Sequence, residues 1–141
     1  MAEPPVIVEA RGRQMRIGAL NDRGRVLLAM MRPAIESLAE VAEFKATEEA
    51  FDLVIRTPDR VFNEEERSRA PSVFSVLRAL VGHFKSDEDH HLGLYGAFGY
   101  DQAFQFEPLE FNLGRPADQR GLGRFLAVEI LVAGTLVCVF S

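Results

Sequence analysis

Cysteine is almost absent from this chain of 141 residues, because Cys138 is the only one. A single cysteine excludes an intrachain disulfide, and one chain cannot assemble a thiolate metal cluster from it. We therefore expect a protein that folds in a reducing compartment, and the cytoplasm is the predicted location.

Long apolar runs and a leader pattern are also lacking. The longest uncharged run, 130–141, is shorter than the roughly 18 to 20 apolar residues that cross a bilayer. The first twelve residues, MAEPPVIVEARG, contain no basic segment followed by an apolar one, so we expect no secretory signal. We predict no membrane partner.

Positive charge is neither abundant nor concentrated. The sixteen Lys and Arg residues are scattered, and the net charge is -5. Nucleic-acid binding requires a clustered basic patch, so we predict no nucleic-acid partner.

What the chain does have is the composition of a folded globular protein, with 48% hydrophobic and 26% charged residues. No repeat, low-complexity tract or Gly/Ser-rich linker divides it, so we expect residues 1–141 to form a single domain. The local patterns along the chain predict an α+β fold, with a mainly antiparallel sheet and packed helices.

The first elements are predicted from alternation and turn residues. Residues 14–20 alternate polar and apolar side chains, which indicates a half-buried strand. The segment 21–24, Asn-Asp-Arg-Gly, is typical of a turn, so we predict a hairpin with a second strand over 25–29. Pro33 suits a first helical turn, which predicts a helix over 32–41. Residues 51–57 are predicted to be another strand.

Two helices are predicted in the middle of the chain. Asn63, followed by carboxylates, predicts the cap of a short helix. Pro71 and Ser72 open a second helix with an apolar stripe at three- and four-residue spacing, formed by Val73, Leu77, Leu80, Val81 and Phe84.

Two further strands are predicted towards the C-terminus. Residues 92–99 alternate, with Leu92, Leu94, Gly96 and Phe98 on one face. Residues 127–141 are β-prone and carry no charge after Glu129, so an exposed edge there would favour aggregation. We expect this run either to fold back into the sheet as a hairpin or to lack the part that covers it.

Residues with potential chemistry all have a simpler structural interpretation. Asp87, Glu88, Asp89, His90 and His91 place carboxylates and imidazoles together, but adjacent histidines on a turn do not converge on one ion. Cys138 lies between two valines, without the base or cationic surroundings of a catalytic thiol. We interpret the first group as a solvated turn and Cys138 as packing.

The remaining candidates lead to the same interpretation. Gly93, Gly96 and Gly99 do not have the spacing of a phosphate loop. Glu64, Glu65 and Glu66 diverge by about 100° each on a helix, and Asp101, after Tyr100, suits a helix cap. We therefore predict no catalytic, cofactor-binding or metal-binding residue in this chain.

Several segments, in order, resemble one enzyme family. They are GRQM at 12–15, NDRGRVLL at 21–28, PDRVFNEEERS at 58–68, VFSVLRAL at 73–80, GAFGYD at 96–101, Phe106-Glu107, RPADQR at 115–120 and EILV at 129–132. Together they resemble the N-terminal domain of anthranilate synthase component I, in the form fused to its glutaminase. The similarity extends over most of the chain, from about residue 5 to residue 132.

The resemblance implies a pathway and a reaction. Members of this family are lyases of tryptophan biosynthesis, a branch of aromatic amino acid biosynthesis, and convert chorismate and glutamine into anthranilate, pyruvate and glutamate with Mg²⁺. In the family, the C-terminal domain binds chorismate and Mg²⁺, and the glutaminase lies further downstream. Those two parts are the partners that the resemblance implies, and no family catalytic residue falls on a position of this chain.

We therefore expect an incomplete domain, without the tryptophan-sensing segment that precedes it in the family, and inactive alone. Ala127-Val128 and Ala133-Gly134-Thr135 depart from the family pattern around EILV, which is typical of a truncated or decaying gene, a frameshifted reading frame, or a fragment whose ends are not native. Two alternatives stay open. One is a stand-alone module that binds an aromatic amino acid or another protein, and the other is a fragment of aminodeoxychorismate synthase.

Overall fold

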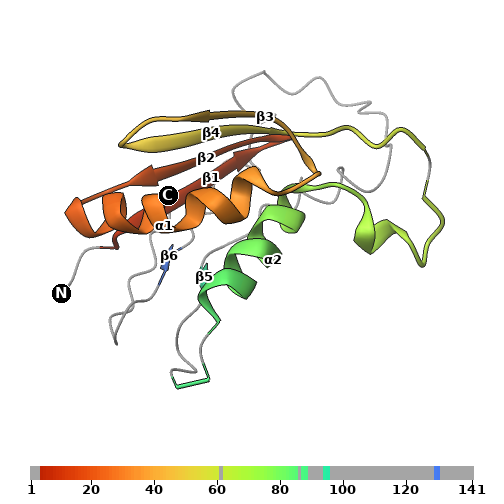
Figure 1. The fold of residues 1–141 in the computed structure, drawn as a ribbon. Coiled ribbons are helices and arrows are strands. Elements are labelled where there is room, and N and C mark those ends of the chain that lie inside the picture. The colour runs from red at the N-terminus through yellow and green to blue at the C-terminus, as the bar shows by residue number, and fades with distance from the viewer. Residues whose placement is uncertain (1–3, 61, 86, 89–93, 96–128, 131–141) are drawn as a thin grey trace, which may run out of the picture.

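The computed structural model describes residues 4–60, 62–85, 87–88, 94–95 and 129–130. These residues form a four-stranded sheet, two α-helices on one of its faces and a separate pair of short strands (Figure 1). Every described pair of neighbouring strands is antiparallel. The predicted α+β class with a mainly antiparallel sheet is confirmed.

The larger sheet has the order β1-β2-β4-β3, with β1 at Val6–Arg11, β2 at Gln14–Ala19, β4 at Ala50–Ile55 and β3 at Val41–Ala46. Gly12 joins β1 to β2 with a φ of 57°, a left-handed conformation that glycine adopts without steric cost. Strands β2 and β4 confirm two predicted strands within two residues. Strands β1 and β3 were not predicted.

Helix α1 (Asp22–Glu36) occupies the region predicted as a turn and a second hairpin strand, and those two predictions are wrong. The helix predicted over 32–41 is confirmed only for 32–36, because α1 begins ten residues earlier and ends at Glu36. Asn21 is the N-cap, because its Oδ1 accepts a hydrogen bond from the Gly24 N–H at 3.1 Å. Its Nδ2 donates to the Pro4 carbonyl oxygen at 3.2 Å, which ties the helix to the start of the chain. Pro33 lies in the last turn of α1 and is exposed. Its missing N–H therefore removes a hydrogen bond only near the end of the helix.

The position of α1 also explains the strand order. β2 and β3 each pair antiparallel with β4, so they run parallel to each other. Two parallel strands need a long crossover connection, and α1 supplies it over one face of the sheet (Figure 1). Strand β4 then returns between them.

The short helix predicted at Asn63 is partly present. Asn63 does cap, since its Oδ1 accepts a hydrogen bond from the Glu66 N–H at 2.9 Å. The cap leads into a turn and a 3₁₀ helix, η1 (Arg67–Arg69), instead of an α-helix. Pro71, two residues after η1, favours an extended conformation in the residue before it, so an α-helix has no room to continue.

Helix α2 (Val73–Phe84) confirms the second predicted helix. The Ser75 Oγ accepts a hydrogen bond from the Ser72 N–H at 3.2 Å at its N-terminus. Of the predicted stripe, Val73, Leu77 and Leu80 are buried, but Val81 is 44% exposed. Val76 is buried instead, at the correct spacing from both Val73 and Leu80.

One apolar core lies between the sheet and the helices. Strands contribute every second residue and the helices contribute one stripe each, namely Val6, Val8, Ala10, Met15, Ile17, Phe51, Leu53 and Ile55 with Leu27, Leu28, Met31, Ile35, Val73, Val76, Leu77 and Leu80. The Phe44 and Phe51 rings pack edge to face at 5.3 Å. At the surface, the Arg25 guanidinium donates to Glu49 at 2.7 Å, which joins α1 to the β3–β4 turn and raises the pKa of Arg25.

Two short strands, β5 (Leu94–Tyr95) and β6 (Glu129–Ile130), pair antiparallel, and β6 lies close to β1. They fall within the predicted strands at 92–99 and 127–141. The rest of both predictions lies outside the described residues.

Candidate functional site

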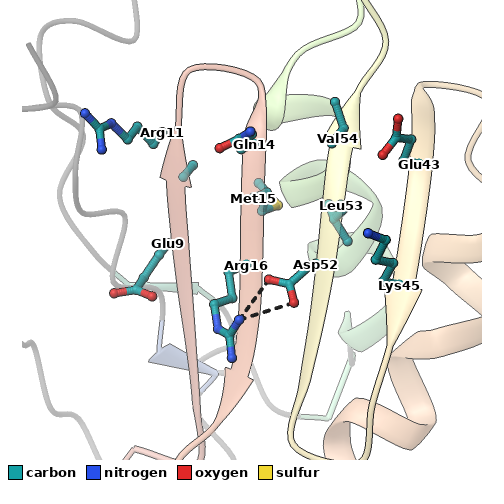
Figure 2. A pocket seen from close by; sticks show the side chains of 11 residues that line it. Glu9, Arg11, Gln14, Met15, Arg16, Glu43, Lys45, Asp52, Leu53 and Val54 are labelled. Atoms are coloured by element: carbon teal, nitrogen blue, oxygen red, sulfur yellow. Dashed lines mark hydrogen bonds and ion pairs between the residues drawn. The ribbon is translucent and has the colours of Figure 1, made fainter. Parts of the chain in front are cut away.

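The face of the larger sheet that points away from the helices is polar, and we call it the outer face. It is formed by the strand residues that alternate with the core residues, and the main ones are Glu9, Arg11, Gln14, Arg16, Glu43, Lys45, Asp52 and Val54 (Figure 2). Because strand side chains alternate between the two faces, burying one face leaves this set outside.

Four charged residues of the outer face form a line across the sheet, which we call the charge row. The strand register places Glu9 opposite Arg16, Arg16 opposite Asp52, and Asp52 opposite Lys45. Each strand therefore contributes one charge, and the sign alternates from β1 to β3. Opposite charges on adjacent strands favour this pairing, whereas a shift of one residue would bury them.

One direct ion pair lies at the centre of the charge row in the described part of the chain. A guanidinium nitrogen of Arg16 lies 3.0 and 3.2 Å from the two carboxylate oxygens of Asp52 (Figure 2). Both side chains are about half exposed, at 56% and 50%, so water screens the pair. Such exposed pairs contribute about 0 to 1 kcal/mol to stability.

The outer face is hollowed, with a cavity of about 420 Å³ that opens to solvent between the side chains of β1, β2, β4 and β3. Its lining combines carboxylates, basic groups, one amide and a few apolar side chains. None of these lining residues is a serine, cysteine or histidine. The arrangement of charges can bind charged groups.

Arg13, in the β1–β2 turn, bonds to the two residues that flank the loop 57–70. Its guanidinium donates to the Arg56 carbonyl oxygen at 2.9 Å and to the Pro71 carbonyl oxygen at 2.8 Å. These two carbonyls stand at either end of the loop 57–70, so Arg13 holds the ends of that loop together. Partial burial lowers the pKa of Arg13.

Replacing Arg13 with methionine is expected to lower the free energy of unfolding by about 1 to 2 kcal/mol, because two carbonyls lose a charged donor. Arg16→Met is the matched control on the same hairpin and is expected to cost less than about 1 kcal/mol, since its ion pair is exposed. Urea denaturation followed by circular dichroism measures both. Equal losses for the two variants would contradict the role given to Arg13.

The candidates from the sequence do not gather at one site. Glu64 and Glu65 are exposed, and Glu66 lies 3.6 Å from the Arg60 guanidinium, so the three carboxylates do not converge. Asp87 and Glu88 are exposed.

The other candidates fall outside the described residues, namely Asp89, His90, His91, Gly93, Gly96, Gly99, Tyr100, Asp101 and Cys138. Within the described residues, no group of three or more His, Cys, Asp or Glu side chains is placed to hold a metal ion. None of the helices described is long and apolar enough to cross a membrane. The predicted lack of catalytic, cofactor-binding and metal-binding residues stays a prediction.

Sequence reasoning missed the outer face, because β1 and β3 were not predicted. A signal was present. Charged residues recur at a spacing of two in both strands, as Glu9 with Arg11 and Glu43 with Lys45, which is typical of a strand with one solvated face.

Comparison with known proteins identifies a relative. No family model matches the chain. Over 124 residues, the chain is 48% identical to the anthranilate synthase of Azospirillum brasilense. The resemblance to anthranilate synthase is confirmed. The matched region covers 88% of this chain but only 17% of that anthranilate synthase, so the chain spans about one sixth of the relative's length.

The segments that carry the anthranilate synthase resemblance have clear places in the fold. The segment 12–15 contains the β1–β2 turn with Arg13, and 21–28 contains the N-cap and first turns of α1. The segment 58–68 lies in the loop whose ends Arg13 holds, and 73–80 lies in α2. Arg13 of the first segment therefore bonds the two residues that flank this loop, Arg56 and Pro71.

Proposed function

We propose that this chain is a piece of an anthranilate synthase component I, that it corresponds to the N-terminal domain, and that it does not catalyse the reaction alone. The observation that carries the proposal is 48% identity to an anthranilate synthase over 124 residues that amount to 17% of that enzyme. The relative is an anthranilate synthase, so its identity to this chain also favours an origin in anthranilate synthase over one in aminodeoxychorismate synthase.

The reaction belongs to the whole enzyme. Anthranilate synthase converts chorismate and glutamine into anthranilate, pyruvate and glutamate, with Mg²⁺ at the chorismate site. The described residues do not fit that ion, since no three potential ligands are grouped among them, so we derive no step through Mg²⁺ from this chain. Its proposed role is structural, as a sheet and two helices against which the chorismate-binding and glutaminase parts assemble.

The purified chain is expected to form no anthranilate from chorismate, ammonia and Mg²⁺. The reaction is followed by the fluorescence of anthranilate, and the Azospirillum brasilense enzyme serves as the positive control under the same conditions. Anthranilate formed in proportion to the concentration of this chain would overturn the proposal of inactivity.

Fragment complementation tests the structural role. The Azospirillum brasilense enzyme is prepared without the region that matches this chain, and the chain is then added separately. Recovery of anthranilate formation supports the proposal. If activity does not recover and calorimetry shows that the chain binds tryptophan, the alternative of a stand-alone amino-acid-binding module is favoured instead.

A further inference from the structure

We infer that the outer face is a self-association surface, on which a second copy of this chain docks face to face. This inference does not depend on the proposed function. It rests on the order of charges across the sheet, on their exposure and on the open cavity between them.

The charge row is complementary to itself. From β1 to β3 its signs are negative, positive, negative and positive, for Glu9, Arg16, Asp52 and Lys45. A two-fold axis that lies between two copies and parallel to the strands reverses this order in the second copy. Glu9 of each copy then faces Lys45 of the other, and Arg16 faces Asp52. A two-fold interface requires this kind of self-complementarity.

The next row of the outer face follows the same symmetry. The register places Arg11, Gln14, Val54 and Glu43 in one line, with a positive charge at one end and a negative charge at the other. Reversed by the same axis, Arg11 of one copy faces Glu43 of the other, and Gln14 faces Val54. The same operation therefore brings opposite charges together at the two ends of the second row, whose centre is uncharged.

Three residues of the charge row, Arg16, Asp52 and Lys45, are exposed, and Glu9 is half-buried. Arg16 and Asp52 keep 56% and 50% of their side-chain surface exposed even though they pair with each other. Glu9 and Lys45, at the two ends of the charge row, form no ion pair within the described part of the chain. The cavity of about 420 Å³ gives long side chains of the second copy room to reach between the strands. Twisted sheets pack face to face with their strands roughly aligned, which is the arrangement that this axis produces.

The expected association is weak and sensitive to salt. Four strands spaced by about 4.8 Å, with about 20 Å of length each, present roughly 400 Å² per copy. Stable specific interfaces bury about 800 Å² per partner, so we expect a weak, transient dimer. Because its contacts are between exposed charges, raising the salt concentration is expected to dissociate it.

Sedimentation velocity over a concentration series, at about 50 mM and about 500 mM salt, measures the dimer. Glu9→Lys and Lys45→Glu each place two like-charge pairs across the two-fold axis, so each is expected to raise the dissociation constant at least about tenfold. The double variant restores opposite charges at both ends and is expected to dimerise again. An equimolar mixture of the two single variants is also complementary at every position of the charge row, and is expected to form the mixed dimer.

Two controls separate the charge row from net charge. Glu65→Lys makes the same change in charge as Glu9→Lys, and Lys85→Glu the same change as Lys45→Glu, at exposed positions away from the outer face. Both controls are expected to dimerise like the unchanged chain. A monomer at all concentrations, a dimer that salt does not weaken, or a double variant that stays monomeric would each overturn the inference.

Discussion

Gly24→Ala is expected to lower the free energy of unfolding by about 3 kcal/mol or more, at the upper end of the usual cost of overpacking a core. Gly24 is buried in the first turn of α1. A Cβ on it would overlap the carbonyl oxygen of Pro5, and would lie 2.9 Å from the carbonyl carbon of Pro5 and 3.1 Å from the Cα of Ala19.

These neighbours are backbone atoms, so no side-chain rotation relieves the overlap. The Pro5 carbonyl oxygen also accepts a hydrogen bond from the Leu20 N–H at 2.9 Å, which fixes its position. Either that bond breaks or α1 moves away from the sheet, and the latter separates Leu27, Leu28 and Met31 from the core.

Urea denaturation followed by circular dichroism measures the loss. The matched control is Gly82→Ala in α2, where a Cβ meets no atom within 4 Å. That change is expected to stabilise the protein by about 0.5 to 1 kcal/mol, because alanine has the higher helix propensity. If Gly24→Ala behaved like Gly82→Ala, the close approach of α1 to Pro5 would be contradicted.

Leu80→Ala is the second large effect that we expect, a loss of about 2 to 5 kcal/mol in the free energy of unfolding. Leu80 is fully buried in the core between α2, α1 and the sheet. Truncating it removes apolar contacts and leaves a cavity that the packed neighbours fill only in part.

The neighbouring residue provides the comparison. Val81 is 44% exposed, so Val81→Ala is expected to cost less than about 1 kcal/mol. Leu80→Met nearly conserves volume and is expected to cost less than about 1.5 kcal/mol, which keeps a folded variant available if Leu80→Ala unfolds the domain. Thermal and urea denaturation distinguish the three. Similar losses for Leu80→Ala and Val81→Ala would contradict the orientation of α2.

Signals within a few residues predicted some elements well and others wrongly. Alternation over 14–20 was sufficient for β2, and the apolar stripe after Ser72 was sufficient for α2. Asn21 was ambiguous, because an asparagine side chain that favours a turn also caps a helix. Its hydrogen bond to the Gly24 N–H, together with packing of the α1 stripe on the sheet, made the region helical.

The sequence by itself determined the class of fold, the resemblance to anthranilate synthase and the alternation that divides each strand into a buried and a solvated face. Only the tertiary structure decided that β4 lies between β2 and β3, that Arg13 joins the ends of the loop 57–70, and that four charges form one row. The physical reason is distance along the chain. Glu9, Arg16, Asp52 and Lys45 become neighbours only through the register of strands that are up to about forty residues apart, and register depends on packing of the whole core.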